Sequence, residues 1–146
     1  MSRNNKQAHI IDANILENVE RALHCYFEGL YHADSQLLAK AFHPDARYVN
    51  AMSGNYSNLS MSEYFKVIDQ RHSPAKNHDD YHCKIISIEL GDTQMAFAKV
   101  SIIMMERQYI DFLTLSTTDG QWKIMSKVFS YQAIKNNPLI LKSTHT

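Results

Sequence analysis

The chain has 146 residues and a mass of 16.8 kDa, and its fifteen Lys and Arg balance its fifteen Asp and Glu. A chain of this length normally forms one domain with a single hydrophobic core. Its 45% apolar and 21% charged residues exclude a disordered or fibrous protein. The net charge of zero argues against a broadly basic surface that neutralises phosphates, so nucleic acid is not an expected partner.

The sequence carries no sign of a membrane or of a bound cofactor. No apolar run approaches the length of a membrane span and the first nine residues are polar, so we predict a cytoplasmic protein. Cys25 and Cys83 have neither a CxxC nor a metal-ligand spacing, which is typical of a reduced compartment. Neither Gly-rich phosphate motif, GxGxxG or GxxxxGK, is present. The cluster from His78 to His82 matches no closed zinc pattern, so we expect neither cofactor nor metal.

The N-terminal half is predicted to be mainly helical. Apolar residues first recur at helical spacing, and Asp34 is then a suitable N-cap for a second helix that Pro44 ends. Ser60 and Glu63 form a capping box that begins a third helix. The predicted elements are a polar lead over 1–10, helices over 11–30 and 34–43, a strand over 46–51, a loop over 53–58 and a helix over 60–73.

The C-terminal half is predicted to be a sheet of four strands. Short turns join consecutive apolar runs, so neighbouring strands are expected to pair antiparallel as a meander. Both faces of the middle strands carry apolar residues, so one face should pack on the helices and the other on a second copy in a homodimer. The predicted strands cover 81–90, 94–105, 108–116 and 122–134, giving one α+β domain over 11–134 with a tail over 135–146.

Several segments resemble a known superfamily. The stretch ALHCYFEGLYHADSQLLAKAFHPDARYVN, over 22–50, is similar to the opening of the nuclear transport factor two-like superfamily. The pieces AFHPDA (41–46), YIDFLTL (109–115) and DGQWKIMSKVF (119–129) resemble its branch of putative lumazine-binding proteins, which is close to the polyketide cyclase-like and ketosteroid isomerase-like branches. The resemblance covers about 11–134. It implies a cone-shaped α+β fold, with three helices packed on a curved, mostly antiparallel sheet of cystatin-like shape.

In proteins of this kind a pocket opens between the concave face of the sheet and the helices. Strand parity then selects the side chains that enter it. On the strand over 108–116, one face carries Tyr109, Asp111, Leu113 and Leu115, and the resemblance implies that this face looks inward. The other expected ligand-binding residues are Tyr48 and Asn50 on the short strand, and Tyr26 and Tyr64 on the helices.

Asp111 is the candidate catalytic residue. It lies in the apolar run Ile110 to Leu113, where a carboxylate costs several kcal/mol unless it is paired or protonated. A buried acid beside a phenol is the arrangement that ketosteroid isomerase-like sites use for proton transfer. Alternatively, Asp111 forms a structural ion pair with Lys99 or Lys127, or faces a dimer partner. Parity does not decide which face of the sheet either lysine occupies.

Three functions are consistent with this sequence. The first is binding of a small, largely apolar molecule in the pocket. The second is an isomerase- or cyclase-like enzyme with Asp111 as general acid/base and a tyrosine as donor to an oxyanion. The third is a dimerisation module without catalytic activity. A closed pocket with Asp111 ion-paired would argue against the enzyme.

Overall fold

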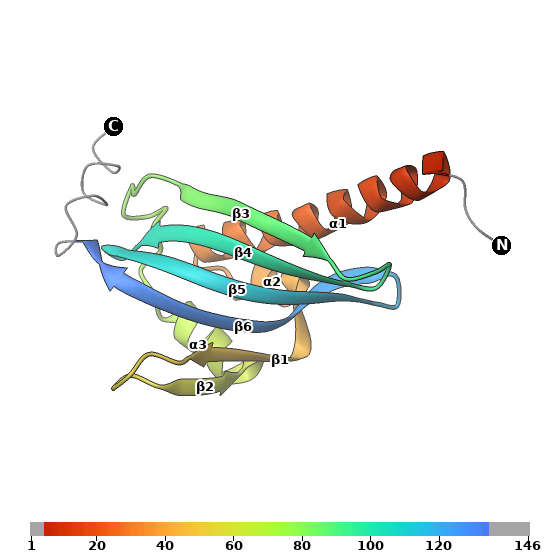
Figure 1. The fold of residues 1–146 in the computed structure, drawn as a ribbon. Coiled ribbons are helices and arrows are strands. Elements are labelled where there is room, and N and C mark those ends of the chain that lie inside the picture. Colours follow the sequence, from red (N-terminus) through yellow and green to blue (C-terminus); the bar gives the residue numbers. More distant parts are fainter. Residues whose placement is uncertain (1–4, 135–146) are drawn as a thin grey trace.

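The computed structural model describes residues 5–134, with side chains from residue 12 onward (Figure 1). Residues 1–4 of the predicted lead and the predicted tail over 135–146 lie outside the described residues. The described chain forms three helices and six strands, as the α+β prediction requires. In order they are α1 (Asn5–Tyr31), α2 (Ser35–Ala41), β1 (Phe42–Asn50), β2 (Ser57–Ser60), α3 (Met61–Asp69), β3 (His82–Leu90), β4 (Met95–Met104), β5 (Arg107–Thr118) and β6 (Gln121–Ala133).

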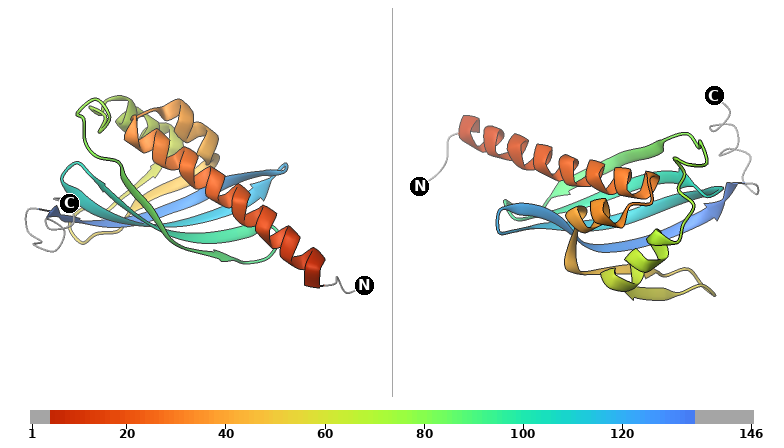
Figure 2. Two further views of the ribbon diagram at one scale, coloured as in Figure 1. Left: turned by 90° about the horizontal axis from the view of Figure 1, so that it is seen from above. Right: turned by 180° about the vertical axis from the view of Figure 1, so that it is seen from behind.

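The six strands form a single sheet in the order β2-β1-β6-β5-β4-β3. Strands β3 to β6 pair antiparallel in sequence, which confirms the predicted meander. Strand β1 pairs antiparallel with β2 but parallel with β6, so the N-terminal strands extend the meander at its β6 edge. All three helices cover one face of this twisted sheet, and the other face is left uncovered by helices (Figure 2).

The predicted helix starts and stops are confirmed in part. Asp34 caps α2, because its carboxylate accepts from the backbone N–H groups of the first turn, and Ser60 with Glu63 forms the predicted capping box of α3. Helix α1 begins at Asn5, so part of the predicted polar lead is helical. Helix α2 ends at Ala41 rather than near Pro44, which lies in extended backbone within β1.

Two features of the middle segment differ from the prediction. Strand β2 lies partly in the predicted loop over 53–58 and extends β1 as a hairpin. Its sequence, SNLS, has no β-branched residue and so a low strand propensity. Pairing with β1 therefore holds these four residues in the extended conformation. Helix α3 ends at Asp69, before the predicted end at Ser73.

The core lies between the helices and the inner face of the sheet. Helix α1 buries Val19, Leu23, Phe27 and Leu30, the stripe expected from helical spacing. The inner face of β5 buries Tyr109, Asp111, Leu113 and Leu115, as the predicted parity requires. No helix within the described residues 5–134 is long and apolar enough to cross a bilayer.

Candidate functional site

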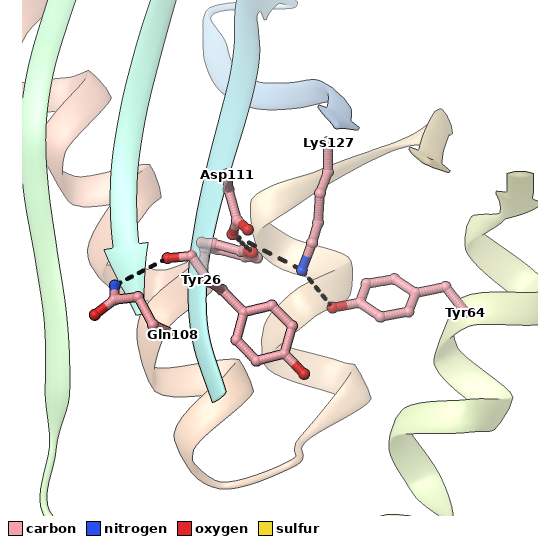
Figure 3. Close-up of polar contacts among 6 residues, drawn as sticks. Tyr26, Tyr64, Gln108, Asp111 and Lys127 are labelled. Atoms are coloured by element: carbon pink, nitrogen blue, oxygen red, sulfur yellow. Dashed lines mark hydrogen bonds and ion pairs between the residues drawn. The ribbon is translucent and has the colours of Figure 1, made fainter. Parts of the chain in front are cut away.

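The site begins with two ionisable side chains that point into the core from neighbouring strands. Asp111 on β5 and Lys127 on β6 are both buried, and Lys127 Nζ lies 3.9 Å from Asp111 Oδ2. Figure 3 shows the lysine side chain reaching toward Asp111 and Tyr64. Gln108, also drawn there, bonds with Ser101 and does not join them. The pairing of Asp111 with Lys127, one of the predicted alternatives, is therefore observed.

Two helices add phenol groups to this pair. Tyr26 of α1 donates its hydroxyl hydrogen to Asp111 Oδ2. Tyr64 of α3 accepts a long hydrogen bond of 3.4 Å from Lys127 Nζ. Both phenols are fully buried. Four elements thus contribute one polar side chain each to a network at the centre of the molecule.

Asp111 is satisfied on one oxygen only. Its Oδ2 atom accepts a hydrogen bond from the Tyr26 hydroxyl and faces Lys127. Its Oδ1 atom is buried and has no hydrogen-bond partner in the described part of the chain. A buried carboxylate oxygen without a donor costs free energy, and such atoms are rare in folded proteins. Oδ1 is therefore an acceptor in the interior that no described group of the fold uses.

Aromatic rings surround the Lys127 amine. Nζ lies 5.1 to 5.5 Å from the ring centroids of Tyr26, Tyr48, Tyr64 and Phe129. We call these four rings the aromatic cage. A cation over a ring face is attracted to it, but rings replace only part of the hydration that an ammonium has in water.

Burial shifts the proton affinities of the cage and of the amine. It lowers the pKa of Lys127 from its ordinary value, and the nearby Asp111 offsets this only in part. Burial also raises the pKa of Tyr26 well above its ordinary value, and the charge of Asp111 raises it further. Burial likewise raises the pKa of Tyr64. Both phenols therefore stay protonated further into the alkaline range and can donate a hydrogen bond.

The predicted ligand-binding residues lie around this network. Tyr48 is half-buried, and its ring centroid lies 4.5 Å from that of Tyr64 and 4.8 Å from that of Phe129. Asn50 is buried and uses its side-chain oxygen to accept from the backbone N–H of Met52. Tyr109 and Leu113 are buried on either side of Asp111 along β5.

Sequence parity alone did not reveal Lys127 as a site residue. A bulge in β6 decides its direction: Leu115 pairs with Ile124 but Thr114 pairs with Ser126, so Met125 is an extra residue. The bulge reverses the parity of the strand and turns Lys127 inward. Lys99 occupies the opposite face, where it pairs with the exposed Phe112. The signal that could have found Lys127 is its place between the apolar residues of a strand at the centre of the sheet.

The network is closed to solvent. Tyr26, Tyr64 and Asp111 have no exposed surface, and Lys127 is 3% exposed. Five surface depressions of about 210 to 470 Å³ lie elsewhere, and none of these five is lined by a member of the network. The open pocket expected beside Asp111 is therefore not seen, and the closed, ion-paired state favours the structural alternative for Asp111. A substrate has to enter by moving side chains apart.

The histidine-rich segment does not form a metal centre. His82 Nε2 lies 3.8 Å from Asp80 Oδ2, and Asn77 bonds with Asp79. Over the described residues, no three His, Cys, Asp or Glu side chains gather in a way that could hold a metal ion. Cys25 and Cys83 are unpaired with one another.

Comparisons with known proteins agree with this architecture. A family model described as “Putative lumazine-binding” matches residues 14–130. The curated protein “Aldolase FrzH” from Cladobotryum sp is 30% identical over 106 residues, which cover 73% of this chain and 82% of that protein.

Solved structures share the fold at lower identity. An NTF-2 like protein of unknown function from Silicibacter pomeroyi has a TM-score of 0.68 at 18% identity, over 83% of this chain and 98% of that one. A second, from Methylobacillus flagellatus, has a TM-score of 0.69 at 22% identity, over 81% and 92%. A protein titled “Putative Scytalone Dehydratase”, from Novosphingobium aromaticivorans, has a TM-score of 0.61 at 17% identity, over 85% and 88%. These likenesses confirm the expected nuclear transport factor two-like fold.

Proposed function

We propose that this chain, which belongs to the family described as “Putative lumazine-binding”, is an enzyme that moves a proton at the carbon next to a carbonyl group. Its substrate is a small, largely apolar molecule. Asp111 is the general acid/base, its role in the isomerase- or cyclase-like alternative of the sequence analysis. The observation that carries the proposal is the buried Oδ1 of Asp111, which no hydrogen bond occupies while Tyr26 holds Oδ2.

Each group of the network has a role in this reaction. Tyr26 orients the carboxylate through Oδ2, so that Oδ1 takes the proton from carbon. The negative charge that develops on the carbonyl oxygen needs a donor. Tyr64 can supply it, because its oxygen accepts from Lys127 and no hydrogen bond from its own hydroxyl is seen to a described residue.

The surroundings define the class of substrate. The aromatic cage presents ring faces to the reacting groups and offers few polar contacts. A molecule with an apolar body and one carbonyl group complements such a site. Tyr48 is the half-exposed member of the cage, and we propose that the substrate enters by displacing its ring.

The similarity to an aldolase supports this choice of chemistry. An aldol addition begins when a base removes a proton from the carbon next to a carbonyl, which is also the first step of an isomerase or cyclase of this kind. The relative is named an aldolase, and it covers 73% of this chain at 30% identity. The choice among aldol addition, cyclisation and isomerisation depends on the substrate.

The closed, ion-paired state agrees with the structural alternative, but two features of the geometry do not. A purely structural ion pair gains most from short, multiple hydrogen bonds, because they offset the cost of desolvation. Here the two charges are 3.9 Å apart and one carboxylate oxygen is unpaired. Binding without catalysis remains the second candidate, since the same apolar interior would hold a ligand.

Proton exchange at carbon tests the proposal. The protein is incubated in D₂O with cyclohexanone, acetylacetone and phenylacetone, and deuterium uptake beside the carbonyl is followed by NMR. We expect the native protein to accelerate exchange, and Asp111→Asn to slow it by about 10²-fold or more. Asp119→Asn is the matched control, because Asp119 lies in the turn after β5, with a positive φ of 52° that Asn tolerates.

The outcomes separate the three functions. Equal exchange by the native protein and Asp111→Asn contradicts the enzyme. If the native protein gives no exchange but a probe shifts the NMR signals of Tyr26 and Tyr64, the protein is a binder. If no probe does either, the buried pair has a structural role only.

We also propose that the outer face of the sheet forms a homodimer and that the protein is cytoplasmic. Phe97 and Phe112 are 43% and 44% exposed on this face, and their rings stack at 5.5 Å. Beside them a depression of about 210 Å³ is lined in part by Phe112 and Val128. A two-fold axis would place the aromatic pair of each copy against the apolar face of the other.

A further inference from the structure

We propose that Lys127 is a covalent catalyst: its amine forms an imine with the carbonyl carbon of the substrate before Asp111 removes the proton. The inference rests on the proposed function and deepens it, because it names the substrate as an aldehyde or an unhindered ketone. The position of Lys127 Nζ among Asp111, Tyr64 and the aromatic cage carries it.

The neighbours of Lys127 fix the position of its amine but leave part of its hydrogen-bonding capacity unused. Its contacts in the network are a long hydrogen bond of 3.4 Å to Tyr64 and the 3.9 Å approach to Asp111. A structural lysine normally makes shorter hydrogen bonds from its three N–H groups. Lys127 Nζ therefore keeps bonding capacity inside the network, as Asp111 Oδ1 does.

Burial shifts the amine of Lys127 toward its neutral form, which is the nucleophilic form. The groups that face Lys127 are Asp111 and Tyr109 of β5, Tyr26 of α1, Tyr48 of β1, Tyr64 of α3, and Arg71 after α3. Asp111 favours the ammonium, whereas burial and the like charge of Arg71 oppose it. Burial dominates, so the pKa of Lys127 is lowered, as in lysines that act as Schiff-base nucleophiles.

Imine formation can be written with the groups present. The nitrogen lone pair of Lys127 adds to the carbonyl carbon, and one proton passes from nitrogen to oxygen by way of Tyr64, giving a carbinolamine. The carbon–oxygen bond then breaks as Asp111 donates to oxygen the proton that it took from the ammonium of Lys127, and water leaves. The product is an iminium ion whose positive charge lies beside the Asp111 carboxylate.

The iminium ion makes the next step easier. A positively charged nitrogen withdraws electrons more strongly than a neutral carbonyl oxygen, so the neighbouring C–H bond becomes more acidic. Asp111 Oδ1 takes that proton and leaves an enamine on Lys127, which can attack a second carbonyl or be protonated at another carbon. Water then restores the amine and releases the product.

Two other lysines of the sheet do not share these surroundings. Lys99 is partly exposed on the outer face, opposite the network. Lys123 donates to the backbone carbonyl of Lys40 near the surface. Neither has a carboxylate and a phenol within reach of its amine among the described contacts, so Lys99 is a suitable control.

Reductive trapping tests the imine directly. The native protein is incubated with cyclohexanone and sodium cyanoborohydride at neutral pH, and hydride addition converts any imine into a stable secondary amine. Peptide mass mapping should find one cyclohexyl group on Lys127, formed faster than on any surface lysine. Lys99→Arg should label normally, whereas Lys127→Met and Lys127→Arg should lose the site.

A second probe requires no reductant. Acetylacetone converts a nucleophilic amine into a vinylogous amide with a near-ultraviolet absorption band. We expect the native protein to develop this band with one equivalent per chain, and Lys127→Met to lack it. Circular dichroism and thermal unfolding identify a variant that fails to fold, and labelling of the native protein still decides the question in that case.

The results distinguish this inference from the proposed function. Labelling only at surface lysines, with deuterium exchange that Lys127→Met retains, overturns the imine and leaves Asp111 as the base. Labelling at Lys127 without deuterium exchange overturns the acid–base proposal and keeps a reactive amine. If both proposals are correct, Lys127→Met slows exchange by about 10²-fold or more.

Discussion

Asp111 and Lys127 are diagonal neighbours on the inner face of the sheet. Asp111 pairs in register with Phe129 and Lys127 with Leu113, so each charged residue lies opposite an apolar residue of the adjacent strand. This offset produces the 3.9 Å separation of Nζ and Oδ2 in place of a close ion pair. Tyr26 and Tyr64 then reach the two groups from different helices. The arrangement keeps an acid and an amine apart within one apolar interior.

Tyr26→Phe removes the hydroxyl group that orients Asp111. Because hydrogen bonds to charged groups contribute about 1.5–3 kcal/mol, we expect a loss of that order in the free energy of unfolding. Deuterium exchange should slow as well, since the carboxylate is no longer held. Urea unfolding and the NMR exchange assay measure the two effects. The control is Tyr31→Phe on the same helix, whose hydroxyl donates to the backbone carbonyl of Asp79 and should affect stability only.

The buried phenols predict a loss of stability in alkali. The pKa values of Tyr26 and Tyr64 are raised in the folded state above the ordinary value of 10.0. Their contribution is therefore complete below pH 10 and is lost as the pH rises toward the folded values, because only the unfolded chain has released these protons. Each phenol adds about 1.4 kcal/mol per pH unit to the decline. Urea unfolding at a series of alkaline pH values should show a shallower decline for Tyr26→Phe; equal slopes would contradict the assignment.

Tyr48→Ala should open the site. The ring packs on Tyr64 and Phe129 and covers Lys127 from the half-exposed side. Its removal should accelerate the reaction of Lys127 with acetylacetone, measured as the growth of the vinylogous amide band. Tyr56→Ala, at a ring that is 68% exposed, is the control and should leave the rate unchanged. A slower reaction in Tyr48→Ala would show that the substrate takes another route.

Gly29→Ala should loosen the contact between α1 and α2. A Cβ atom at Gly29 would lie 2.6 Å from Cδ2 and 3.2 Å from the backbone nitrogen of Leu38, which is fully buried and cannot move aside. We expect a loss of about 1–3 kcal/mol in the free energy of unfolding, measured with urea. At Gly91 the clash is with the exposed side chain of Met95, so Gly91→Ala should cost much less. Equal losses would contradict this account.

A charge on the outer face of the sheet should dissociate the homodimer. Phe112→Glu places a carboxylate in the exposed aromatic pair with Phe97, and the two copies would then bury like charges against one another. Light scattering at micromolar concentration should report a dimer for the native protein and a monomer for the variant. Tyr56→Glu, at an exposed ring in the connection between β1 and β2, is the control. A native monomer would contradict the proposed dimer.

The sequence predicts the helices of this fold better than its site. Capping at Asp34 and Ser60 is local chemistry, and the apolar stripe of α1 follows from helical geometry, so both could be predicted. Alternation along β5 placed Asp111 on one face with Tyr109 and Leu113, and the family resemblance implied that this face looks inward. Lys127 depends instead on a bulge, and a bulge is set by the packing of two strands rather than by the residues of one. Strand β2 was not predicted for the same reason: it forms by pairing with β1, and its own four residues carry no strand signal.

The parallel pairing of β1 with β6 has a consequence for how the molecule is made. Strand β6 lies between β1 and β5, yet it is the last described strand to leave the ribosome. Until then β1 and β5 both present open edges, which are prone to pair with other chains. The pairing of Tyr48 with Lys127 also closes a long loop, which slows folding. The buried pair of Asp111 and Lys127 is therefore completed late, when β6 closes the sheet and buries its own lysine.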